Sequence, residues 1–124
     1  MIARILMGTL LATPLGLALS AQEAGHEKPV SFTKDVMPVL AKHCIECHNP
    51  EKKKGKLDMS TYEALKAGGK KKSPFVAGDP DKSLMVQMIS GNEPEMPEEG
   101  EPLSKETVAL ISRWIKEGAR NDAK

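Results

Sequence analysis

The chain has 124 residues, 40% of them hydrophobic, and it carries 18 basic and 17 acidic side chains. This length accommodates one small domain, and the nearly balanced charge argues against a globally basic surface for binding nucleic acid. The aromatic residues are only one Trp, one Tyr and two Phe. Because a domain of this size buries only about two thirds of its unfolded surface, we expect a thin core that something else helps to fill.

Residues 1–20 have the layout of a secretory signal peptide. Arg4 precedes an apolar run, and the small residues Ala18 and Ser20 stand before a cleavage point at Ala21. The run is shorter than the roughly 20 residues that span a bilayer, although an uncleaved anchor is the alternative. We expect export to the periplasm, cleavage near Ser20 and Ala21, and no stable membrane anchor afterwards.

A polar tail, residues 21–30, precedes the first predicted helix. Phe32, Val36 and Leu40 recur at every fourth position, which is typical of an amphipathic helix. This helix is expected to end near the cysteines. Pro38 lies inside it, so the sequence predicts either a kink or a helix that starts late.

Two short helices are predicted in the middle of the chain. Ser60 and Glu63 have the spacing of a capping box, and Gly68 would end that helix. Asp79 is the predicted cap of the next helix, and Pro80 would open it.

The clearest pattern belongs to the last helix. Ser104 is its predicted cap and Gly118 its end. Apolar side chains gather on one face of it, namely those of Val108, Ile111, Trp114 and Ile115. No segment alternates as a strand does, so the predicted fold class is all-α.

Both cysteines of the chain lie in the stretch HCIECH, between His43 and His48. Three chemistries use such residues: a disulfide or thiol switch, a metal site, and covalent attachment of haem. A bare C-x-x-C is weak evidence for the first, and a structural zinc site needs four ligands where this stretch supplies three. The longer string Cys44-x-x-Cys47-His48 is the attachment motif of c-type haem.

The spacing of this motif has a geometric reason. Two thiols one helical turn apart reach the two vinyl groups of a haem, and the imidazole of the next residue then lies under the iron. Thioether attachment also requires export. The sequence therefore predicts one covalent haem c, bound through Cys44 and Cys47, with His48 on the iron. A haem-free module stabilised by zinc or a disulfide is the alternative.

A methionine is the candidate for the second axial ligand, since His/Met ligation raises the reduction potential of a haem. Met37, Met85 and Met88 stand among apolar neighbours, where methionine usually packs in the core. Met96 instead lies in a polar loop, followed by Pro97, and is predicted to turn its sulfur toward the iron. If it is merely an exposed loop residue, an open sixth site would bind small ligands or peroxide.

Several motifs agree along the chain: FTKDVMPVL, CIECH, GKLDM, AGDPDKSL, MP and WIKEGA. In this order they resemble the planctomycete-type cytochrome c domain, a branch of the single-haem class I c-type cytochromes. The resemblance covers about residues 31–119, and we place the domain at 31–120. It implies a small helical fold around one haem, with the first and last helices crossing. It also implies Cys44 and Cys47 as thioether positions, His48 as the proximal ligand and Met96 as the distal one.

Two positions depart from the family pattern. Asn49 stands where glycine is common, and asparagine is the next most tolerant residue of a left-handed backbone. Glu98 stands where a second proline usually follows Met96 and Pro97. Six residues are expected to form the haem wall, each with ordinary helix core as the alternative: Phe32, Leu40, Phe75, Leu84, Ile111 and Trp114.

The predicted protein is a monomeric, periplasmic, monohaem cytochrome. It carries single electrons and catalyses no bond chemistry itself. Its expected partners are redox proteins, either an exported dehydrogenase or a terminal oxidase. Lysines gather at 52–56 and 70–72, and glutamates surround Met96. These charges either steer docking of a partner or simply keep the loops solvated.

Overall fold

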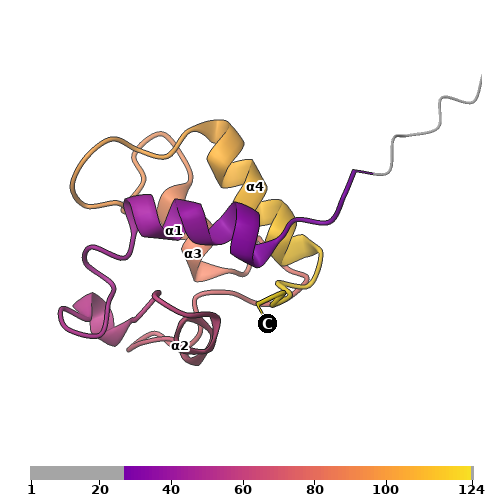
Figure 1. Cartoon of the computed structure of the whole chain (residues 1–124). Coiled ribbons are helices and arrows are strands. Elements are labelled where there is room, and N and C mark those ends of the chain that lie inside the picture. Colours follow the sequence, from indigo (N-terminus) through magenta and orange to yellow (C-terminus); the bar gives the residue numbers. More distant parts are fainter. Residues whose placement is uncertain (1–26, 124) are drawn as a thin grey trace, which may run out of the picture.

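The computed structural model describes residues 27–123, which form short helical segments joined by long loops (Figure 1). The elements are a π-helical turn η1 (Phe32–Val36), α1 (Met37–His43), a 3-10 turn η2 (Lys54–Lys56), α2 (Tyr62–Ala67), α3 (Leu84–Ile89) and α4 (Lys105–Lys116). Residues 27–123 contain no strand beyond two isolated bridges, so the predicted all-α class is confirmed for them. The predicted signal peptide and residues 21–26 of the predicted tail lie outside the described residues.

In residues 27–123, no helix is both long enough and apolar enough to cross a membrane.

The first predicted helix is helical along its length, but regular α geometry begins only at its middle. The N–H of Val36 donates to the carbonyl of Ser31 at 3.2 Å, and that of Met37 donates to the carbonyl of Phe32. These five-residue steps make η1 wider than an α-helix. Since Pro38 has no N–H to donate, α1 starts beside it, and the expectation of a late start is confirmed.

The last helix, α4, has the predicted limits. The hydroxyl of Ser104 accepts the N–H of Thr107 at 3.1 Å and so satisfies one free donor of the first turn. Gly118 has a φ of 106°, a left-handed value that favours glycine and ends the helix. The predicted apolar face is buried at Ile111, Trp114 and Ile115, which are at most 1% exposed.

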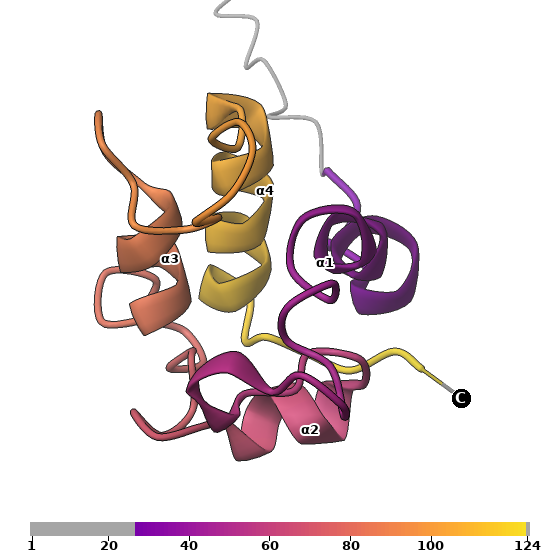
Figure 2. The ribbon, with the colours of Figure 1, turned by 90° about the vertical axis from the view of Figure 1, so that its left-hand side faces the viewer.

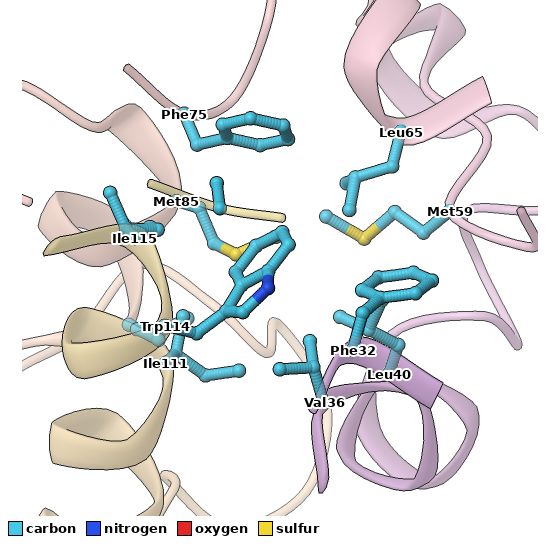
Figure 3. Close-up of a cluster of buried hydrophobic side chains, with 12 residues drawn as sticks. Phe32, Val36, Leu40, Met59, Leu65, Phe75, Met85, Ile111, Trp114 and Ile115 are labelled. Carbon is cyan, nitrogen blue, oxygen red and sulfur yellow. The ribbon is translucent and has the colours of Figure 1, made fainter. Parts of the chain in front are cut away.

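All the aromatic side chains meet in one cluster around Trp114. The Trp114 ring centroid lies 5.5 Å from that of Phe32, 5.2 Å from Phe75 and 6.4 Å from Tyr62. Figure 3 shows Trp114 between the side chains of η1 and α1 on one side and those of Phe75 and α4 on the other. The few aromatics therefore form a compact core of their own.

This core lies where the two ends of the domain meet. In Figures 1 and 2 the α1 ribbon crosses beside α4, so the expected crossing of the first and last helices is confirmed. Polar bonds add to the apolar contact: the N–H of Val30 donates to the carboxylate of Glu117 at 2.8 Å. Asp122 accepts hydrogen bonds from the Ser31 hydroxyl and, at 2.8 Å, from the N–H of Thr33.

The predicted cap of α2 is wrong by one residue. Thr61 caps the helix, because its hydroxyl accepts the N–H of Ala64 at 3.1 Å. The hydroxyl of Ser60 donates instead to Asp58, at 2.6 Å, and is therefore occupied. The predicted end is confirmed, since Gly68 follows the helix with a φ of 73°.

The predicted start of the next helix is also wrong. The carboxylate of Asp79 accepts the N–H of Lys82 at 3.2 Å and closes a turn, but α3 begins only at Leu84. Its N-cap position holds Ser83, which is fully buried. The Ser83 hydroxyl accepts the N–H of Val76 at 2.9 Å and donates to the carbonyl of Asp79 at 2.8 Å. It thereby fixes the loop before α3.

We expect Ser83→Ala to lower the free energy of unfolding by about 1–3 kcal/mol, because it leaves the buried partners of the hydroxyl unsatisfied. Urea unfolding followed by far-UV circular dichroism measures this loss. Ser90→Ala is the matched control, since Ser90 is half-buried and its hydroxyl makes no hydrogen bond among residues 27–123. Equal losses in the two variants would contradict the assigned role.

We also expect a pH-dependent contribution from Asp122. Its hydrogen bonds to Ser31 and Thr33 lower the pKa of the Asp122 carboxyl from 3.8 to about 2. The stability that they supply is therefore fully present above pH 3.8 and lost as the pH falls through about 2. Asp122→Ala should be less stable than the parent at pH 7, and the deficit should shrink between pH 3.8 and 2.

The measurement is the urea midpoint across this pH range, with Asp81→Ala as control. Asp81 is exposed, and its carboxylate has no hydrogen-bond partner in the described part of the chain. A deficit of Asp122→Ala that does not change with pH would contradict the argument.

Candidate cofactor site

A cavity of about 690 Å³ opens in the described part of the chain, bordered by the cysteine motif, α3 and the loop that leads to α4. Its volume lies within the range of roughly 300–1,000 Å³ that is usual for cofactor and ligand sites. Its lining includes Cys44, Cys47, His48 and Met96. The structure therefore brings all the residues predicted to hold a haem to one cavity.

The cysteine motif forms one helical turn after α1. The N–H groups of Cys47 and His48 both donate to the carbonyl of Cys44, at 3.2 and 3.0 Å. This is the spacing of one turn of helix, which the sequence argument requires for two thiols that face the same group.

Asn49 closes this turn with its side chain. Its amide N–H groups donate to the carbonyls of Ile45 and Glu46 at 2.7 and 2.9 Å, and its amide oxygen accepts the N–H groups of Glu51 and Lys52. Asn49 is not among the residues with positive φ, so its tolerance of a left-handed backbone is not used here. Asparagine contributes here by bonding the carbonyls that the helical turn leaves free.

His48 has one ring nitrogen fixed and the other available. Its Nδ1 lies 2.9 Å from the carbonyl oxygen of Lys54. Because a carbonyl only accepts, Nδ1 carries the proton, and in the neutral ring Nε2 keeps its lone pair. This bond also orients the ring, in the way that ligand histidines are commonly held by a second group. The arrangement suits Nε2 for binding a metal.

The two cysteines are free thiols in the structure. Burial raises the pKa of the Cys44 thiol to about 11, so this thiol stays protonated at neutral pH and is a weak nucleophile by itself. Among residues 27–123, no three His, Cys, Asp or Glu side chains come together in a group that could hold a metal ion.

The wall of the cavity is aliphatic and rich in methionine. Side chains from the loop before α2 and from α3 line it, namely Leu57, Met59, Leu84, Met85, Met88 and Ile89. Of the six residues expected to form a haem wall, only Leu84 lines the cavity. The other five are buried in the core, so the alternative of ordinary helix core is correct for four of them, and Phe75 packs into the core from a loop. A flat apolar group fits this part of the lining, which offers it aliphatic and thioether contact.

Four methionines line the cavity, Met59, Met85, Met88 and Met96, whereas the sequence predicted only Met96 there. Met59 and Met85 are also part of the core, at 6% and 7% exposure, whereas Met88 and Met96 are half-buried. The N–H of Met96 donates to the carbonyl of Met88 at 2.9 Å. This bond ties the Met96 loop to the end of α3 and keeps Met96 at the cavity. Sequence spacing misses Met59, because its loop position carries no helical pattern.

Charged side chains surround the opening of the cavity. We call Lys42, Lys54, Lys70, Lys71 and Lys72 the basic rim, and Glu98, Glu99 and Glu101 the acidic rim. The two rims meet where Lys54 Nζ lies 3.3 Å from a carboxylate oxygen of Glu98. The hydrogen bond to Glu98 raises the pKa of Lys54. Glu46, in the cysteine motif, also lines the cavity.

Comparison with known proteins yields one family. No curated protein and no solved structure matches this chain. The family model described as Planctomycete cytochrome C matches residues 44–100. This segment begins at the first cysteine of the motif and includes Met96 and part of the acidic rim. The resemblance to the planctomycete-type cytochrome c domain is thus confirmed, and residues 44–100 are identified as a Planctomycete cytochrome C region.

Proposed function

We propose that this chain is a monohaem c-type cytochrome of the class I kind, which carries single electrons between redox proteins. The observation that carries the proposal is that Cys44, Cys47, His48 and Met96 all line one cavity, with the His48 ring bonded through Nδ1 to the Lys54 carbonyl. The family match supports a c-type cytochrome.

Each of these residues would have a distinct task. Cys44 and Cys47 would hold one haem through thioether bonds, and His48 and Met96 would be the axial ligands. A haem iron held in this way supplies a one-electron couple. The carbonyl of Lys54 would keep the His48 ring in place. The aliphatic wall would exclude water and so help to set the reduction potential.

The same proposal covers catalysis and location. With both axial positions taken by side chains, no position is left for a substrate, and the protein would transfer electrons without bond chemistry of its own. We further propose a periplasmic location after removal of the signal peptide. Covalent haem attachment through thiols fits export, and the family match supports the same assignment.

Redox proteins are the proposed partners, an exported dehydrogenase or a terminal oxidase among them. The charged rims support this proposal because they surround the opening through which a partner would approach. Complementary charge accelerates such encounters more than it strengthens them.

The proposed ligation predicts an optical change. The chain exported in a haem-maturing host should give a low-spin, six-coordinate spectrum, and Met96→Ala should turn it high-spin because the sixth ligand is lost. Met88→Ala is the matched control, since Met88 lines the same cavity and should leave the iron low-spin.

Other outcomes have definite meanings. A parent spectrum that is high-spin already would contradict ligation by Met96 and favour an open sixth site. If Met88→Ala gave a high-spin spectrum and Met96→Ala left the spectrum unchanged, Met88 rather than Met96 would be the axial ligand. Absence of any haem spectrum would contradict the proposed function itself.

The rims predict that small redox reagents react at salt-dependent rates. Hexacyanoferrate(III), an anion, should meet the basic rim, and the cation tris(phenanthroline)cobalt(III) the acidic rim. The rate of stopped-flow oxidation of the reduced protein by either reagent should fall measurably, by up to about tenfold, between low and physiological ionic strength. The reason is that salt screens exposed charges beyond about 8–10 Å. A nearly neutral chain without local steering would give flat rates with both.

A further inference from the structure

The charges at the cavity opening are separated by sign. Lys70, Lys71 and Lys72 follow α2, and Lys54 belongs to η2. The acidic rim belongs wholly to the loop between α3 and α4. In Figures 1 and 2 that loop lies at the upper part of the molecule and η2 and α2 at the lower part. Apart from Lys42 on α1 and Glu46 in the cysteine motif, one side of the opening is therefore basic and the other acidic.

The basic side is held in a fixed shape by contact between its two loops. The N–H of Lys70 donates to the carbonyl of Gly55 at 2.9 Å. A Cβ on Gly69 would overlap that same carbonyl oxygen, so the loops approach as closely as glycine permits. Lys72, in the basic rim, has a φ of 72°, a left-handed value that favours glycine.

A surface with one basic and one acidic side complements itself. When a second copy is related by a two-fold axis that lies in the plane of the opening, along the boundary between the rims, its acidic rim faces the first copy's basic rim, and the reverse. The whole chain has a formal net charge of only +1, so two copies do not repel each other strongly at a distance. A partner of one sign would meet attraction on one side of the opening and repulsion on the other.

We propose that the cavity opening is a transient docking surface for a second copy of this chain, arranged with two-fold symmetry. The docking permits electron exchange between copies, and this use rests on the proposed function. The reduced copy gives one electron to the oxidised copy, and the two part with their states exchanged. No bond is made or broken and no proton is transferred. The encounter is weak and governed by salt, because its contacts are exposed charges.

The test uses two variants of opposite sign. Lys70→Glu with Lys71→Glu cancels the excess positive charge of the basic side, and Glu99→Lys with Glu101→Lys reverses the sign of the acidic side. All four residues are exposed, and none belongs to an ion pair among residues 27–123. Folding should therefore be unaffected, which circular dichroism checks. Self-association of the full mature chain is measured by sedimentation and NMR diffusion, which do not depend on electron transfer.

For the parent, we expect self-association that falls about tenfold between low and physiological salt. Each variant alone should associate about tenfold more weakly than the parent at low salt. An equimolar mixture of the two should associate more strongly than either variant alone, because the intact acidic rim of the first then faces the intact basic rim of the second. In haem-loaded protein, the electron self-exchange rate from NMR line widths should follow the same order.

Two results would overturn the proposal: a parent whose diffusion does not change with concentration or salt, or a mixture that associates no better than its components. The spectrum of the same samples reports haem independently. A normal low-spin spectrum without association would overturn this inference and leave the proposed function standing. Association of a protein that shows no haem spectrum would overturn the proposed function and leave only the docking surface.

Discussion

The contact between Phe32 and Trp114 joins the two ends of the domain, and the other elements are arranged around it. The two rings lie 5.5 Å apart, and both are at most 2% exposed. Burying a ring of this size removes about 150–250 Å² from water, which corresponds to roughly 4–6 kcal/mol. Since α1 leads directly into the cysteine motif, fixing η1 and α1 against α4 also fixes where that motif begins.

The aromatic core has a consequence for the rest of the molecule. Because every aromatic side chain is used beside Trp114, the side of the domain that bears Cys44 and His48 is built from aliphatic and methionine side chains around a cavity. Unbranched methionines adapt their shape to a neighbour more easily than rings do. The interior of the domain therefore has two regions. Protein side chains alone fill the region around Trp114, and the region beside Cys44 and His48 is a cavity whose volume suits a cofactor.

The sequence predicted those features that depend on a local pattern. The last helix followed from its apolar period and from Ser104, and the helical turn of the cysteine motif followed from the spacing of Cys44 and Cys47. Predictions failed where a side chain had a choice of partners: Ser60 bonds Asp58 rather than the helix, and Ser83 rather than Asp79 begins α3. The cavity wall could not be predicted, because the same apolar pattern marks residues that face the core and residues that face the cavity.

The two sides of the cavity differ in the number of hydrogen bonds that hold them in place. On the His48 side, Asn49 makes four hydrogen bonds, the Lys54 carbonyl holds the ring, and the N–H of Met59 donates to the His48 carbonyl. On the other side, one backbone bond ties Met96 to α3, and the Lys54–Glu98 pair adds only an exposed contact that water and salt weaken. An iron bound between them would therefore lose Met96 more readily than His48. If the chain binds haem as proposed, an open sixth site would be a minor state of the carrier, reached by displacement of the Met96 loop.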